Sequence, residues 1–161
     1  MNNGFSAQIH LVDEAATSRL GERIAPLLRP GDTLLLEGPI GAGKTHFARA
    51  VIQSRLARSG RCEDVPSPTY TLVQVYSDGN TEIWHADLYR LTHADEVVEL
   101  GLDDALADAI VLIEWPERLG DARPANALTL HFNLLGKGRD LMLSSRDPRW
   151  AKIAPSLREV A

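Results

Sequence analysis

The fold of this chain is decided by the stretch Gly38-Pro39-Ile40-Gly41-Ala42-Gly43-Lys44-Thr45. It fits the phosphate-loop pattern G-x-x-x-x-G-K-[ST] at every fixed position. The apolar run before it, residues 33–36, is typical of a buried strand, and residues 47–52 after it are typical of a helix. A strand, a glycine-rich loop and a helix in this order predict a phosphate-binding loop in an α/β domain.

The residue types of this loop suit the phosphate chain of a nucleotide. Glycines let the backbone wrap an anion without Cβ clashes, and successive N–H groups then form a nest at the positive end of a helix dipole. Lys44 reaches the β- and γ-phosphates in such a loop, and the Thr45 hydroxyl ligates Mg²⁺. The residues expected to contact the nucleotide here are Gly38, Pro39, Ile40, Gly41, Ala42, Gly43, Lys44, Thr45 and His46.

Length and composition are those of an ordinary globular domain. The chain has 161 residues, a net charge of -5 and one cysteine, Cys62. We predict a single domain over residues 1–161, because a chain of this length buries roughly 70% of its unfolded surface. The negative charge argues against DNA or other long nucleic acid binding across the whole surface. A single cysteine excludes an internal disulfide, and neither a leader nor a membrane-length apolar run is evident, so we expect a cytoplasmic protein.

The pattern along the chain alternates between helix and strand. Residues 70–76 and 81–88 read as strands, and the turn residues 77–80 between them give a strong hairpin signal. Helical residues follow over 94–106 with a break at Gly101, and a short tail helix is expected from Pro155. This order predicts an α/β sandwich of the P-loop NTPase type, with a mixed, mostly parallel central sheet and a β-hairpin insertion. The other expected strands are 6–12, 33–37, 109–113, 128–134 and 141–144.

Three segments offer the acids and hydroxyls that nucleotide hydrolysis needs besides the loop. The run Ile110-Val111-Leu112-Ile113-Glu114 is a Walker B pattern, although any buried strand can end in Glu. Asp87, in His85-Ala86-Asp87-Leu88-Tyr89-Arg90, is a hard ligand for Mg²⁺ or its waters, or else part of a surface Asp–Arg pair. Thr69, in Ser67-Pro68-Thr69-Tyr70, fits a switch that senses Mg²⁺ and γ-phosphate, or else a simple turn. We expect Lys44, Asp87 and Glu114 to be catalytic and Thr45, Asp87 and Glu114 to hold the metal. We expect a structural role for His85. For Trp115 we favour core packing, with a place near the nucleotide as the alternative.

The four motifs together, over residues 38–117, resemble those of the bacterial TsaE (YjeE) family. The resemblance implies a P-loop ATPase needed to make N6-threonylcarbamoyladenosine (t6A) at position 37 of tRNA. It implies action with the TsaD–TsaB heterodimer, whose assembly and turnover ATP hydrolysis would support, and contact with tRNA only through that complex. Lys44 and Thr45 would hold phosphates and Mg²⁺, Thr69 and Asp87 would serve in two switches, and Glu114 would take the Walker B role. Which of Asp87 and Glu114 touches the metal stays open.

Two other functions compete with this interpretation. One is a small-molecule kinase, which usually needs an arginine-rich lid over the acceptor. The arginine-rich stretch of this chain, residues 55–61, directly follows the loop helix, and no later lid segment is evident. The other is a nucleotide-dependent switch module without a catalytic task. The guanine-reading pattern N-K-x-D is absent from the sequence, which favours ATP over GTP.

Replacing Lys44 tests the loop assignment. Lys44→Ala should abolish productive phosphate binding, because it removes the cation that contacts the β- and γ-phosphates. ATP affinity by titration and ATP hydrolysis are the measurements, and unchanged values of both would contradict a phosphate-binding role for the loop.

Overall fold

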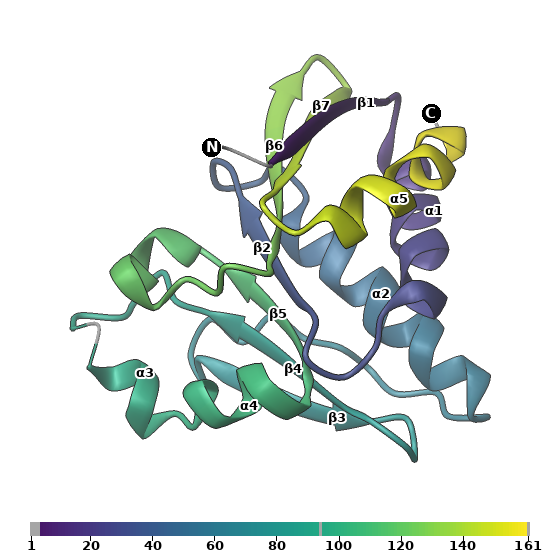
Figure 1. Cartoon of the computed structure of the whole chain (residues 1–161). Coiled ribbons are helices and arrows are strands. Elements are labelled where there is room, and N and C mark those ends of the chain that lie inside the picture. Colours follow the sequence, from purple (N-terminus) through teal and green to yellow (C-terminus); the bar gives the residue numbers. More distant parts are fainter. Residues whose placement is uncertain (1–3, 94, 161) are drawn as a thin grey trace.

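The computed structural model describes residues 4–93 and 95–160. A single seven-stranded sheet runs through it in the order β1-β7-β6-β2-β5-β4-β3 (Figure 1). The strands are β1 (Phe5–Leu11), β2 (Thr33–Glu37), β3 (Val73–Ser77), β4 (Glu82–Asp87), β5 (Ile110–Glu114), β6 (Leu128–Leu135) and β7 (Gly138–Ser145). All seven strands expected from the sequence are therefore present.

The strand directions confirm the predicted mixed, mostly parallel sheet. β2 pairs in parallel with β5 and β6, and β4 pairs in parallel with β5. β7 runs antiparallel to both β6 and β1, and β3 runs antiparallel to β4. Five strands, β1, β6, β2, β5 and β4, thus share one direction, and their carboxyl ends meet at one edge of the sheet. Ligands of open α/β sheets bind at this edge.

Helices cover both faces of the central strands (Figure 1). Figure 1 shows α1, α2 and α5 on one side of the sheet and α3 and α4 on the other. The core accordingly has two parts: Leu34 and Leu36 pack on the α1–α2 side, and Leu35 packs on the opposite side. The helices are α1 (Glu14–Ile24), α2 (Lys44–Arg58), α3 (Glu96–Glu99), α4 (Leu102–Asp108) and α5 (Pro148–Leu157), with 3₁₀ turns η1 (Ala25–Leu27), η2 (Pro116–Ala122) and η3 (Arg158–Val160).

Several element boundaries can be compared with the sequence predictions. The hairpin is present as β3 and β4, which extend the central sheet beyond β5 at one end. The break at Gly101 separates α3 from α4, because Gly101 has a φ of 82° in the left-handed region. Position 94, the predicted start of this helical region, lies outside the described residues. The prediction that the tail helix starts at Pro155 is wrong, because α5 begins at Pro148. The side chain of Asp147 caps this helix by accepting a hydrogen bond from the N–H of Arg149.

Nothing in the described ranges reads as a membrane span: none of the helices there combines the length and the apolar character that crossing a bilayer requires.

The β1–β7 pairing offers a test of the fold. A Cβ on Gly138 would lie 2.4 Å from the carbonyl oxygen of Leu11, which is backbone and held in register. Gly138→Ala should therefore lower the free energy of unfolding by about 1–3 kcal/mol in urea denaturation. The matched control is Met142→Ala on the exposed side of the same strand, with an expected change within about 0.5 kcal/mol. Equal losses in the two variants would contradict the close approach.

Candidate nucleotide and metal site

The glycine-rich loop leaves the carboxyl end of β2 and enters α2, as the sequence predicts. Gly38 begins it with a φ of 139°, and a Cβ there would lie 2.5 Å from the carbonyl oxygen of Phe132 on β6. Only glycine fits this approach of two backbones. The neighbouring strand thus fixes the point where the loop leaves the sheet.

The N-terminus of α2 lies open toward the loop. Gly43 caps the helix with a φ of 105°, and no side chain of the described residues accepts a hydrogen bond from the first turn. The first N–H groups of a helix have no partner inside the helix. They therefore remain available, together with the helix dipole, for an anion held by the loop.

Lys44 is the first residue of α2, and its ammonium group is turned back over the loop. Only 4% of the residue is exposed. Nζ donates to the carbonyl oxygen of Gly38 at 2.6 Å and lies 3.3 Å from the ring centroid of Trp115. Burial lowers the pKa of Lys44, while the charges of Glu114, Glu117 and Asp87 act in the opposite direction. The ammonium group is thus poised where phosphate would provide a stronger partner.

Glu114 ends β5 directly beside the loop. Every residue of this strand is buried, and Glu114 itself is 2% exposed. Its Oε1 accepts a hydrogen bond from the Thr45 hydroxyl at 2.7 Å, and its Oε2 lies 2.7 Å from Nε2 of His85. The structure thus brings the hydroxyl of the phosphate loop and the acid of the Walker B strand into direct contact.

Asp87 ends β4 and is paired in register with Glu114. Oδ1 of Asp87 accepts from the N–H of Tyr89 at 3.0 Å, and the hydroxyl of Thr69 is 3.5 Å from Oδ2. The N–H of Asp87 also donates to the carbonyl of Leu72, which has a φ of 67°. These contacts hold the segment with Thr69 against the end of β4, so all the predicted acids and hydroxyls meet at one place.

Trp115 combines the two roles considered from the sequence, because it packs against the α3–α4 side of the core and also lines the candidate site. It follows Glu114 with a φ of 59°, an unusual value for a bulky residue. Its ring lies under the Lys44 ammonium group and 4.9 Å from the ring of Tyr89. The strained backbone turns the indole from the end of β5 toward the loop.

Arg139, at the start of β7, supports the loop from outside. Its guanidinium group donates to the carbonyl oxygens of Ala42 at 2.7 Å and Gly41 at 3.1 Å. Because Arg139 holds these carbonyl oxygens on the outer side of the loop, the N–H groups can face the inner side, where an anion would bind. No motif points to Arg139 in the sequence, since it is 97 residues away from Ala42.

Two further sequence candidates have other contacts. The ring of His46 is directed to α1, where Nε2 lies 2.7 Å from the Ser18 hydroxyl and 3.2 Å from the carbonyl oxygen of Glu14. The backbone of His46 remains as its means of contacting a phosphate. The guanidinium group of Arg90, which the sequence offers as a surface partner of Asp87, lies 5.2 Å from the ring centroid of Tyr70.

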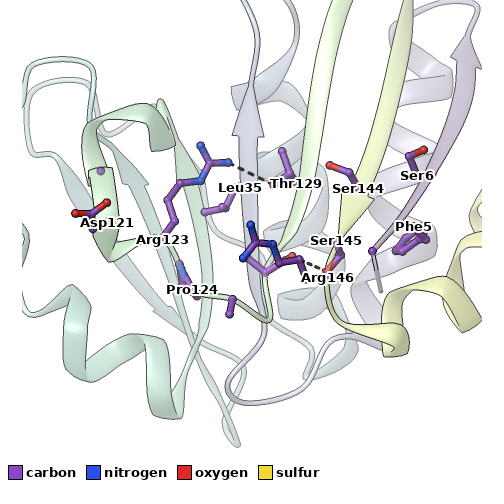
Figure 2. A pocket seen from close by; sticks show the side chains of 14 residues that line it. Phe5, Ser6, Leu35, Asp121, Arg123, Pro124, Thr129, Ser144, Ser145 and Arg146 are labelled. Carbon is purple, nitrogen blue, oxygen red and sulfur yellow. Dashed lines mark hydrogen bonds between the residues drawn. The ribbon is translucent and has the colours of Figure 1, made fainter. Parts of the chain in front are cut away.

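Most of the predicted site residues line a cavity of about 410 Å³ at the carboxyl edge of the sheet, and Gly38, Pro39 and Ala42 are not among its lining residues. Its lining residues are Ile40, Gly41, Gly43, Lys44, Thr45, His46, Ser67, Thr69, Asp87, Tyr89, Glu114 and Trp115. A larger cavity of about 720 Å³ lies beside Leu35 and Arg123, on the face of the sheet opposite to α1 and α2 (Figure 2). Figure 2 shows hydroxyl side chains and two arginines around it, and none of the predicted site residues lines it.

Comparison with known proteins agrees with this geometry. Residues 11–141 match the family model described as "Threonylcarbamoyl adenosine biosynthesis protein TsaE". The chain belongs to the TsaE family. A TsaE of Rickettsia felis is 42% identical over 131 residues, which cover 81% of this chain and 75% of that protein. A TsaE of Bacillus subtilis is 33% identical over 126 residues, or 78% and 76% of the two chains. Both relatives are named tRNA threonylcarbamoyladenosine biosynthesis proteins.

A solved structure shares the fold of this TsaE family member. The crystal structure of Bacillus subtilis YdiB superposes with a TM-score of 0.77 and covers 97% of this chain and 96% of its own. The sequence identity is 23%, so this likeness concerns the fold.

The residues present suit Mg²⁺ with a nucleotide better than a metal held by protein alone. Mg²⁺ keeps several waters and takes one or two carboxylates together with substrate phosphates. Thr45, Glu114 and Asp87 offer that kind of oxygen set beside a buried ammonium group. In the part of the chain that the structure describes, no three His, Cys, Asp or Glu side chains form a metal-binding group of their own.

Asp87 gives a pH-dependent test of the site. Burial raises its pKa above the ordinary 3.8, and the charge of Glu114 acts in the same direction, against the Tyr89 N–H, His85 and Lys44. At neutral pH the Asp87 carboxylate is less well solvated in the folded state than in the unfolded chain, which lowers the free energy of unfolding. This loss of stability disappears as the pH falls below the pKa values of Asp87 in both states.

Asp87→Asn should consequently stabilise the nucleotide-free protein at pH 7, and the gain should shrink toward pH 4. Urea denaturation at a series of pH values measures it, with Asp121→Asn, an exposed acid on η2, as the control for loss of one charge. A gain that is constant with pH, or absent at pH 7, would mean that the site does not penalise the Asp87 charge.

Proposed function

We propose that this TsaE family member is a Mg²⁺-dependent, ATP-binding and ATP-hydrolysing protein that serves t6A modification of tRNA in the cytoplasm. Its ATPase is weak alone and is stimulated by the TsaD–TsaB complex, whose assembly and turnover it supports. It meets tRNA through that complex. The family membership and the names of its relatives support the pathway, and the site supports the chemistry.

The contact between Thr45 and Glu114 carries this proposal. A hydroxyl at the second position of α2 and a carboxylate at the end of β5 meet at 2.7 Å. In P-loop ATPases a loop Ser or Thr and a Walker B acid hold Mg²⁺. The direct contact of Thr45 with Glu114 supports a Mg²⁺ site here, next to the uncapped helix N-terminus that suits phosphates.

Each of the other side chains has a role in this scheme. Lys44 would neutralise charge on the β- and γ-phosphates, for which it would leave the carbonyl of Gly38 and the ring of Trp115. Asp87 would hold a water of the ion, and Thr69 would add a hydroxyl when the phosphate is in place. Glu114 would ligate the ion through water or orient the attacking water. Bound Mg²⁺ would supply charge neutralisation at the transferred phosphoryl group.

The contacts of the arginine-rich stretch, residues 55–61, do not favour a role as the lid of a small-molecule kinase. Arg55 is buried and bonds the carbonyl oxygens of Ala25 and Leu28 and the carboxylate of Asp78. Arg61 donates to the carbonyl oxygen of Ser77. Arg55 and Arg61 therefore hold the far end of α2 against η1 and the hairpin, where both have structural partners.

Exposed apolar groups at the site fit regulation by a protein partner. Tyr70 is 86% exposed and Ile40 is 72% exposed, and they flank Thr69 and the phosphate loop. Apolar side chains gathered beside a functional cavity often mark protein–protein contacts. A partner bound there would act directly on the loop and on the segment with Thr69.

The decisive experiment measures Mg²⁺-dependent ATP hydrolysis by the purified chain, with and without its cognate TsaD–TsaB pair and tRNA. A slow rate that rises with the pair is expected. A fast rate that ignores the pair, or transfer of phosphate to a small acceptor, would contradict the proposal.

Glu114→Ala separates binding from turnover. The loop and Lys44 survive the change, so ATP affinity in EDTA should be retained. The gain in affinity on adding Mg²⁺ should fall, and hydrolysis should fall by about 100-fold or more. Glu22→Ala, an exposed glutamate on α1, is the control and should leave all of these quantities unchanged. Full activity of Glu114→Ala would remove Glu114 from the mechanism.

A further inference from the structure

His85 is a buried titratable residue that the scheme above does not use. It is 0% exposed and lies on β4, two residues before Asp87, so both side chains are on the same face of the strand. Its Nε2 is 2.7 Å from Oε2 of Glu114. Because an ionised carboxylate only accepts hydrogen bonds, this contact assigns the donated proton to Nε2.

The other ring nitrogen shows that the histidine is a poor choice for packing alone. Nδ1 is buried and has no hydrogen-bond partner within the described part of the chain. Its neighbour on the same face of β4 is Ile83, which is fully buried in the α1–α2 side of the core. An apolar side chain at position 85 would fit that environment without leaving a buried polar atom unpaired.

The contacts of Glu114 indicate what the histidine does instead. Glu114 has two oxygens with two different partners: Oε1 with the Thr45 hydroxyl and Oε2 with His85. With Oε2 fixed from the strand side, the carboxylate plane is set and Oε1 is directed at the loop. Partners of this kind orient metal-binding carboxylates, and their loss typically weakens metal affinity or activity by about 10–100-fold.

We propose that His85 is a positioning residue that holds Glu114 in the orientation in which it meets Thr45. This inference rests on the proposed function for its consequence in the loaded protein, but the His85–Glu114–Thr45 chain exists without nucleotide. His85 does not touch the nucleotide or the ion. It acts through Glu114, by donating from Nε2.

Substituting His85 with glutamine or asparagine distinguishes the roles of its two ring nitrogens. Nε2 of a glutamine lies as many bonds from Cβ as Nε2 of histidine does, whereas the amide of an asparagine reaches only the Nδ1 position. His85→Gln can therefore keep the bond to Glu114, and His85→Asn cannot. His85→Leu replaces His85→Asn if the latter does not fold.

The first readout needs no nucleotide. A double-mutant cycle with Thr45→Val and Glu114→Ala, followed by urea denaturation, measures the coupling between these two residues. The coupling should amount to about a 5-fold change in the folding equilibrium in the wild-type and His85→Gln backgrounds and vanish in His85→Asn. Equal coupling in all three backgrounds would overturn the proposal.

The second readout is the gain in nucleotide affinity on adding Mg²⁺. ATP affinity in EDTA should be alike in all variants, because the loop is intact. The gain with Mg²⁺ should fall about 10–100-fold in His85→Asn and be largely restored in His85→Gln. An equal loss in both variants, or no loss in either, would overturn the proposal. If the wild-type chain binds no Mg²⁺ and ATP, the proposed function fails, and the nucleotide-free cycle alone decides the role of His85.

Thr33→Val is the matched control for burial. Thr33 is fully buried at the other end of β2, and its hydroxyl has no hydrogen-bond partner in the described residues. This change removes an unpaired polar atom far from the site, so it should leave the Thr45–Glu114 coupling and the Mg²⁺ dependence unchanged. If it moved either quantity as His85→Asn does, the effects would reflect core packing, and the positioning role would be wrong.

Discussion

The parallel pairing of β2 with β5 is the constraint on which the site depends. It sets Leu36, two residues before the loop, opposite Glu114, the last residue of β5. Both strands are buried among apolar residues on both faces of the sheet, so a shift by one residue would move each core side chain to the opposite face and disrupt the packing on both. The loop hydroxyl and the acid are therefore brought together by the hydrophobic core rather than by their own attraction.

The elements next to this pair follow from local sequence, and the side-chain contacts between distant elements do not. The phosphate loop, the strand ending in Glu114 and the hairpin are carried by short motifs, and each lies where it was predicted. Trp115 packs against the core as expected, but its contact with Lys44 depends on a φ of 59° that the sequence after a strand does not reveal. His85 had a usable signal in its spacing of two from Asp87, which puts both on one face of a strand. Arg139 had none, because a contact across 97 residues depends on the whole sheet order.

The C-terminal helix shows a different limit of prediction from sequence, which is the choice of the residue where a helix begins. Pro155 seemed to open a helix, but the structure begins α5 at Pro148 and keeps Pro155 inside it. A proline suits the first turn of a helix because no partner for its missing N–H is needed there. Asp147 before Pro148 is an N-cap signal of the usual kind. The pair Asp147-Pro148 therefore carries the start signal of this helix in the sequence, and it is a stronger signal than Pro155.

Buried charge makes the site a compromise between stability and binding. Lys44, Asp87 and Glu114 are all nearly inaccessible to water, and the pKa of Lys44 is lowered and that of Asp87 raised mainly by burial. Without ligand, these groups use one another and the protein as partners: Lys44 uses Gly38 and Trp115, and Glu114 uses Thr45 and His85. In the proposed function, a nucleotide with Mg²⁺ would replace the contacts of Lys44 and Thr45, so its net affinity would be the difference between two well-bonded states. A partner that weakened the ligand-free contacts, for instance by moving Trp115 away from Lys44, would raise that affinity without touching the nucleotide.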